Sequence, residues 1–184
     1  MKKIYFIGFI TILSHSISTS QNCKPAIKAT DEFTEQEVIG WGGTLGSSRS
    51  SFQGVSQNLK FYIGSLDGKM FAEISVQYMQ KGLDASVNTI DIPKGSQFML
   101  KTEEGIITFT SIDNQKKRTK MSGYLVTAIS LTAELTQEQL EILAKSPISM
   151  YRIEPEDSEP IKGYVKDKKA EKLLEQFQCF LNNN

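Results

Sequence analysis

The sequence predicts an exported α+β domain: an antiparallel β-sheet of about six strands with two C-terminal helices packed on one face. Period-two alternation of apolar residues between residues 59 and 133 predicts the strands, and helical spacing after residue 135 predicts the helices. The first twenty residues have the pattern of a secretory signal. We therefore expect a signal peptide at 1–20, a Gly/Ser-rich segment at 21–58 that packs on the core, and a core of sheet and helices at 59–184.

The signal pattern consists of two lysines, an apolar run from Ile4 to Leu13, and small residues after it. Cleavage after Ser20 would leave Gln21 as the first residue, and cleavage after Ser18 is the nearby alternative. The apolar run is shorter than the roughly eighteen residues that a membrane-spanning helix needs. The mature protein is therefore expected to be periplasmic or secreted, without a transmembrane segment.

The chain has two cysteines, Cys23 and Cys179. An isolated pair in an oxidising compartment usually forms a disulfide, which here would join the two ends of the domain. Two free thiols, or acylation of Cys23 as in a lipoprotein, are the competing interpretations.

The charge balance gives no electrostatic footprint for nucleic acid, because 21 basic residues face 21 acidic ones. Without the signal peptide the net charge is about minus two. A basic cluster is interpreted as a solvated hairpin loop rather than a polyanion site. It consists of Lys116, Lys117, Arg118 and Lys120.

His15 is the sole histidine and lies in the predicted signal peptide. After cleavage the mature chain would contain no histidine. Ser-His-Asp catalysis, Cys-His catalysis and histidine-rich zinc sites would therefore be excluded. Carboxylate, lysine and tyrosine chemistry remains open. No cofactor and no metal ion is expected.

The stretch Gly40–Gly54 contains several glycines and serines but lacks the spacing of a phosphate-binding loop, so we interpret it as an irregular loop. After it, alternation predicts a hairpin that turns at Asp67-Gly68. Further strands are predicted at Thr89–Ile92, Gln97–Lys101, Ile106–Ile112, Tyr124–Ala133 and Ile148–Ile153.

The first helix is predicted to start after Thr136, because Gln139 three residues later completes a capping box. It should end near Lys145, before Pro147. The last helix is predicted to be capped by Asp167, and its apolar stripe should pack on the sheet.

Three groups of residues are candidates for a site. Trp41, Phe52 and Tyr62 could form an aromatic binding surface, although isolated aromatic residues usually anchor a core. Glu103 and Glu104 could be paired glycosidase carboxylates, but the neighbouring glycine favours a hairpin tip. A third group lacks the spacing of a calcium loop and is interpreted as a solvated acidic loop. It consists of Glu154, Glu156, Asp157 and Glu159.

Several short motifs occur in an order that resembles a family of small exported domains of unknown function from Gram-negative bacteria. They are Asp31-Glu32-Phe33-Thr34, Lys94-Gly95 before Phe98–Leu100, Glu104-Gly105, Leu135-Thr136-x-Glu138-x-Leu140-x-x-Leu143, Pro147-Ile148, Tyr151-Arg152-Ile153 and Phe177-x-Cys179. The resemblance covers most of residues 28–181 and implies the fold more than an activity.

From the absence of catalytic motifs in the sequence we expect an exported, non-enzymatic binding or structural module. Its ligand would be a protein or glycan of the cell envelope, bound by the open face of the sheet or by the Gly40–Gly54 segment. The alternative is a hydrolase of envelope or extracellular polymers that uses carboxylates alone.

Overall fold

The computed structural model describes residues 23–30, 37–50, 55–66, 68–81, 92–156 and 159–183. The predicted signal peptide, Phe52, Asp157 and most of the strand predicted at Thr89–Ile92 lie outside these residues. Within the described residues the protein is mostly antiparallel β-sheet with two helices, as the α+β prediction requires. None of the described helices is long and apolar enough to cross a membrane.

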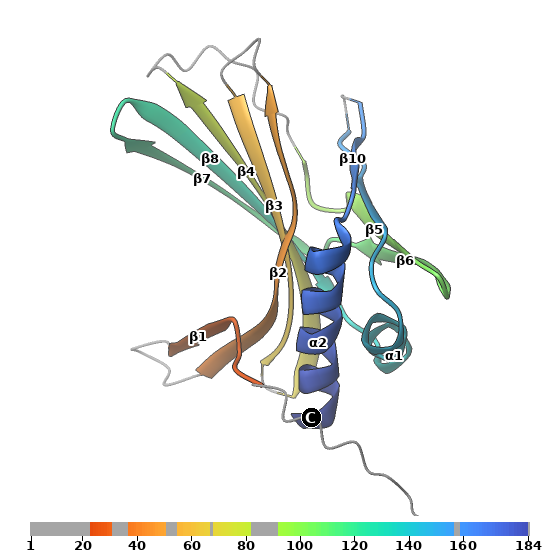
Figure 1. The fold of residues 1–184 in the computed structure, drawn as a ribbon. Helices are drawn as coiled ribbons and strands as arrows, with labels where there is room; N and C mark the ends of the chain where they lie inside the picture. The colour runs from red at the N-terminus through yellow and green to blue at the C-terminus, as the bar shows by residue number, and fades with distance from the viewer. Residues whose placement is uncertain are drawn as a thin grey trace, which may run out of the picture.

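The large sheet has six strands in the order β1-β2-β3-β4-β8-β7, and it curves like half of a barrel (Figure 1). Its strands are β1 (Ile27–Thr30), β2 (Glu37–Ser50), β3 (Val55–Leu66), β4 (Lys69–Lys81), β8 (Tyr124–Glu134) and β7 (Asp113–Met121). The predicted hairpin is β3–β4, and Gly68 in its turn has a φ of 74°. The boundary expected at residues 58 and 59 falls inside β3, so residues on both sides of it belong to one sheet.

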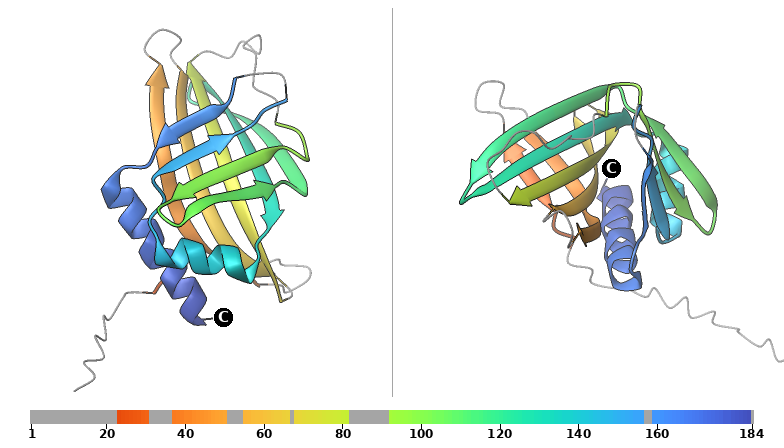
Figure 2. Two further views of the ribbon diagram at one scale, coloured as in Figure 1. Left: turned by 90° about the vertical axis from the view of Figure 1, so that its right-hand side faces the viewer. Right: turned by 90° about the horizontal axis from the view of Figure 1, so that it is seen from above.

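The small sheet has four strands in the order β10-β9-β5-β6. They are β10 (Ile161–Tyr164), β9 (Met150–Ile153), β5 (Gln97–Thr102) and β6 (Gly105–Thr110). Its strands run across those of the large sheet (Figure 2). The sequence predicted one sheet of about six strands, whereas the described residues form ten strands in two sheets. The central pairing of β5 with β9 joins segments that a helix separates in the chain, so no local pattern signals it.

Helix α1 (Gln137–Lys145) begins as predicted. The Thr136 hydroxyl accepts a hydrogen bond from the Gln139 backbone N–H at 3.2 Å, and the Gln139 side chain accepts one from the Thr136 N–H at 3.0 Å. Helix α2 spans Asp167–Asn183, so Asp167 is its first residue rather than its cap. Helix α2 contacts β2 and β3 of the large sheet, and α1 contacts α2.

The core forms where the two sheets and α2 meet at Phe61 of β3. Its ring lies 6.3 Å from that of Phe98 on β5, 6.0 Å from Phe109 on β6 and 5.7 Å from Phe177 on α2. All four rings are at most 1% exposed. Burial of this aromatic cluster therefore holds both sheets and the helix in one domain.

The interpretation of Gly40–Gly54 as an irregular loop is wrong for residues 40–50, which belong to the fourteen-residue strand β2. The glycines allow close backbone approach. A β-carbon on Gly42 would lie 2.1 Å from the Phe61 carbonyl oxygen, and one on Gly46 would lie 2.7 Å from the Tyr151 hydroxyl. The pairing of β2 with β3 shifts register between Thr44 and Gly46. The glycine content therefore reflects packing.

The basic cluster was also wrongly interpreted as a hairpin loop, because it lies within strand β7. In the described part of the chain β7 pairs only with β8, so it is an edge strand. Nearly all of the residues at 113–120 of this strand are exposed, so the sequence there lacks the alternation of apolar and polar residues by which a strand is detected. Lysines on an edge strand hinder pairing with other chains.

The disulfide between Cys23 and Cys179 is confirmed, with α-carbons 5.4 Å apart. Cys179 lies on α2 four residues before the last helical residue, Asn183, because the helix continues beyond the expected end near Leu181. Its side chain is buried (2% exposed) rather than at the surface. The bond consumes the Cys23 thiol, so it excludes the free-thiol and acylated alternatives for the protein in this state.

Candidate binding face

The three aromatic residues predicted as a platform do not form one surface. Trp41 is 8% exposed, and its ring lies 5.1 Å from that of Phe180 in the core. Tyr62 alternates with the buried Phe61 and Ile63 on β3, so it lies on the opposite face of the sheet from Trp41, which pairs with Ile63. Burial and the charge of Glu73 raise the pKa of Tyr62. Phe52 lies outside the described residues.

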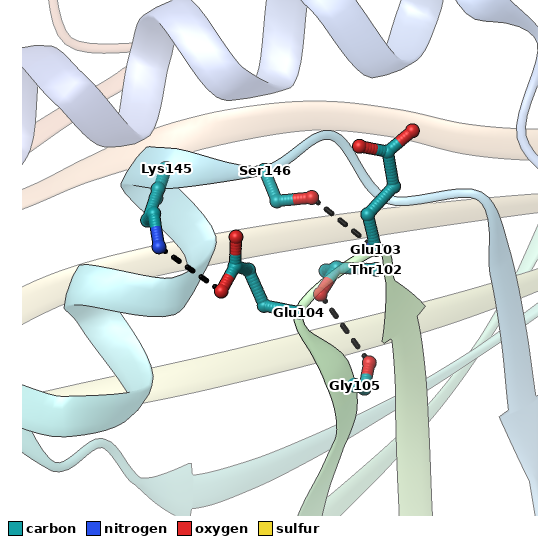
Figure 3. A network of polar contacts seen from close by, with 6 residues as sticks. All are labelled: Thr102, Glu103, Glu104, Gly105, Lys145 and Ser146. Atoms are coloured by element: carbon teal, nitrogen blue, oxygen red, sulfur yellow. Dashed lines mark hydrogen bonds and ion pairs between the residues drawn. The ribbon is translucent and has the colours of Figure 1, made fainter.

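The acidic candidates are also separated. Glu103 and Glu104 form the tip of the β5–β6 hairpin, and their carboxylates point apart in Figure 3. Glu154 forms an ion pair with Arg152. Within the described ranges, no group of three histidine, cysteine or acidic side chains could hold a metal ion.

The outer face of the small sheet carries the two most exposed large hydrophobic side chains of the described residues. These are Tyr164, 78% exposed, and Ile106, 66% exposed. On β6 the buried residues Ile107 and Phe109 point to the core, and on β10 the buried residue is Ile161. Ile106 and Tyr164 occupy strand positions of the opposite parity, so their exposure follows from strand geometry. Large apolar side chains that are exposed on one face of a domain are a feature of interaction sites.

The strand register places these two residues at the ends of one row. Ile106 is opposite Lys101, Lys101 is opposite Met150, and Met150 is opposite Tyr164. The row crosses all four strands, about 14 Å at the usual spacing between neighbouring strands. A second row beside it consists of Thr108, Met99, Arg152 and Lys162. We call these eight residues the outer face.

A pocket of about 290 Å³ lies in the outer face. Its lining includes Met99, Met150 and Ile106 together with the cations Lys101, Arg152 and Lys162. Methionine side chains adapt their shape to different apolar partners. Beneath this face, the Tyr151 side chain is buried, and burial raises its pKa. The arrangement can bind an apolar group and neutralise negative charge next to it.

A larger cleft of about 530 Å³ adjoins the outer face at Tyr164, which is among its lining residues. Its lining also includes the exposed carboxylates of Glu103, Asp167 and Glu171. Asp167 and Glu171 lie in the first turns of α2, where negative charge is favourable near the positive end of the helix dipole.

Polar contacts fix the wall of this cleft (Figure 3). The Glu103 backbone N–H donates to the Ser146 hydroxyl at 3.1 Å, and Lys145 pairs with Glu104 at 3.0 Å. The Ser149 backbone N–H and hydroxyl both donate to the Lys101 carbonyl, at 2.8 and 3.0 Å. The segment after α1 is thus attached to the end of β5, which holds the cleft and the outer face in a fixed relation.

Searches with this chain find no matching protein-family model, no matching curated protein and no matching solved structure. The resemblance to exported domains of Gram-negative bacteria therefore stays a prediction.

The outer face was not predicted from the sequence. Its residues come together only when β5 pairs with β9 and β9 pairs with β10. The residues themselves are ordinary alternating strand positions. One signal was present: Ile106 and Tyr164 are apolar where the alternation calls for a solvent-facing residue.

Proposed function

We propose that this protein is an exported binding module that recognises a protein or glycan of the cell envelope through its outer face. One observation carries the proposal: Ile106 and Tyr164, the most exposed large hydrophobic residues of the described chain, lie in one cross-strand row beside a pocket. The proposal takes α1 and α2 to pack together on one face of the large sheet.

Export is part of the proposal. The disulfide is compatible with an oxidising compartment, and the N-terminal pattern predicts cleavage near Ser20. Sequencing the N-terminus of protein from the native host should give Gln21 or a residue within about two positions. An intact Met1 on the folded protein would contradict export by this signal.

The binding test uses immobilised mature protein and solubilised envelope components. The double variant Ile106→Ser/Tyr164→Ser should lose most of the captured material, because it removes both apolar ends of the row. The matched control is Ile112→Ser/Tyr124→Ser, which changes the same residue types at exposed positions outside this face (46% and 38% exposed). Equal capture by the two variants would contradict the proposal.

The adjoining cleft favours a second candidate, a hydrolase that uses carboxylates alone. Glu103, Asp167 and Glu171 line one concavity, and carboxylates in a cleft are the groups that a two-carboxylate mechanism uses. Release of soluble fragments from cell-wall polymer that is abolished by both Glu103→Gln and Asp167→Asn would support it. No release by the wild type would reject it for that substrate.

A further inference from the structure

The size of the outer-face pocket restricts its occupant. Pockets that bind small molecules usually enclose roughly 300 to 1,000 Å³, and this pocket, at about 290 Å³, is at the lower limit. It has room for one or two side chains rather than a cofactor. The lining is apolar at Met99, Met150 and Ile106, so an apolar side chain fits it best.

The charges around the pocket restrict which groups of the bound partner can lie next to the side chain that fills the pocket. Lys101, Arg152 and Lys162 are exposed cations that line it. Arg152 forms an ion pair with Glu154, so the set retains a positive excess of about two charges. Desolvation of these cations by a neutral partner would be unfavourable, whereas carboxylates on the partner would compensate them.

We propose that the outer face binds an extended, acidic polypeptide segment of a partner protein, anchored by one apolar side chain in this pocket. This inference rests on the proposed function and names the partner class. Lys101 on β5 and Lys162 on β10 are two strands apart and in neighbouring rows, about 12 Å at the usual strand dimensions. In an extended chain, residues three or four positions apart span about 10 to 14 Å. Acidic residues on both sides of the anchor can therefore reach both lysines.

An anionic membrane surface is the less favoured occupant. Recognition of anionic lipids typically uses a cluster of about four to eight basic residues, whereas three cations line this pocket and one of them has an acidic partner. A bilayer surface would also leave the concave pocket unfilled. A peptide side chain fills it.

The experiment measures binding of the mature, disulfide-bonded protein to a fluorescent peptide that carries EDLDE in a Gly/Ser frame. Replacing the peptide leucine by serine should weaken binding about tenfold or more, since it removes the buried anchor. Lys162→Glu should weaken binding about fivefold or more and reduce its salt dependence. Lys117→Glu, the same charge change on β7, should leave the affinity unchanged within about twofold.

Three results would overturn the inference: equal weakening by the two lysine variants, affinity that does not depend on the peptide leucine, or binding to vesicles with phosphatidylglycerol but not to the peptide. These results are distinguishable from failure of the proposed function. If envelope capture still depends on Ile106 and Tyr164 while the peptide does not bind, the face is a binding site for a partner of different chemistry.

Discussion

Cys23 and Cys179 are bonded across 156 positions of the chain, which closes most of the described domain into one loop. Cross-links that close long loops stabilise the folded state by lowering the conformational entropy of the unfolded chain. For a loop of this length the entropy model gives a stabilisation of roughly 5 kcal/mol, and typical measurements give about 2–4 kcal/mol. We predict that Cys23→Ser lowers the melting temperature by about 5–15 °C, measured by circular dichroism. The far-ultraviolet spectrum of the folded protein should not change.

The control for this prediction is the wild type in reducing buffer, which should melt close to Cys23→Ser. Cys179→Ser should melt lower than Cys23→Ser, because Cys179 is buried and Cys23 is exposed. A melting temperature that is unaffected by reduction would contradict a stabilising role of the disulfide.

Gly42 and Gly43 are neighbours on β2 with opposite tolerance for a side chain. Gly42 has a φ of 153°, and a β-carbon there would lie 2.1 Å from the Phe61 carbonyl oxygen, whereas at Gly43 the nearest contact is Leu173 at 3.7 Å. We predict that Gly42→Ala destabilises the protein by about 3 kcal/mol or more in urea unfolding, while Gly43→Ala changes stability by less than about 1 kcal/mol. Similar losses from both would contradict the close approach of β2 to β3.

Phe61 and Tyr62 test the assignment of faces in β3. Phe61→Ala removes the ring that contacts both sheets and α2. It should lower the free energy of unfolding by about 3–5 kcal/mol. Tyr62→Ala, on the other face, should cost less than half as much. Urea unfolding of both variants measures the difference, and a reversed order would show that the register is shifted by one residue.

Burial raises the pKa of Tyr78 from 10.0 to about 12, although the Gln57 side chain, 3.5 Å from its hydroxyl, acts in the lowering direction. Between these pH values the folded protein keeps a proton that the unfolded chain has lost. The contribution to stability is therefore fully present below pH 10 and is lost as the pH rises toward 12. We predict that Tyr78→Phe reduces the fall in urea midpoint above pH 10. An unchanged pH dependence would contradict the burial of this hydroxyl.

Local patterns predicted the parts of the fold that local interactions determine. The capping box at Thr136, the β3–β4 hairpin and the end of α1 before Pro147 were each visible in a few neighbouring residues. The disulfide followed from the cysteine count and the expected compartment. Residues 38–41 of β2 were predicted as a short strand, but residues 42–50 of β2 and the whole of β7 were missed for physical reasons. This part of β2 carries glycines for close packing, and β7 is an edge strand exposed along most of its length.

The outer face was beyond sequence reasoning because its residues come from strands joined by nonlocal pairing. Ile106 is far in the chain from Met150 and Tyr164, and the three residues meet only through the register of β6, β5, β9 and β10. The aromatic residues that composition suggested, Trp41 and Tyr62, lie on opposite faces of the large sheet. Alternation assigns a residue to one of two faces, but it does not reveal which face is covered.

The most direct test of the outer face as the binding site is photo-crosslinking in the native host. A photoreactive phenylalanine analogue would replace Ile106 or Tyr164 in one pair of strains, and Ile112 or Tyr124 in the control pair. We predict a discrete crosslinked species, lost under competition by excess mature protein, from positions 106 and 164 and none from 112 and 124. Crosslinks of equal yield from all four positions, or from the control positions alone, would contradict the account.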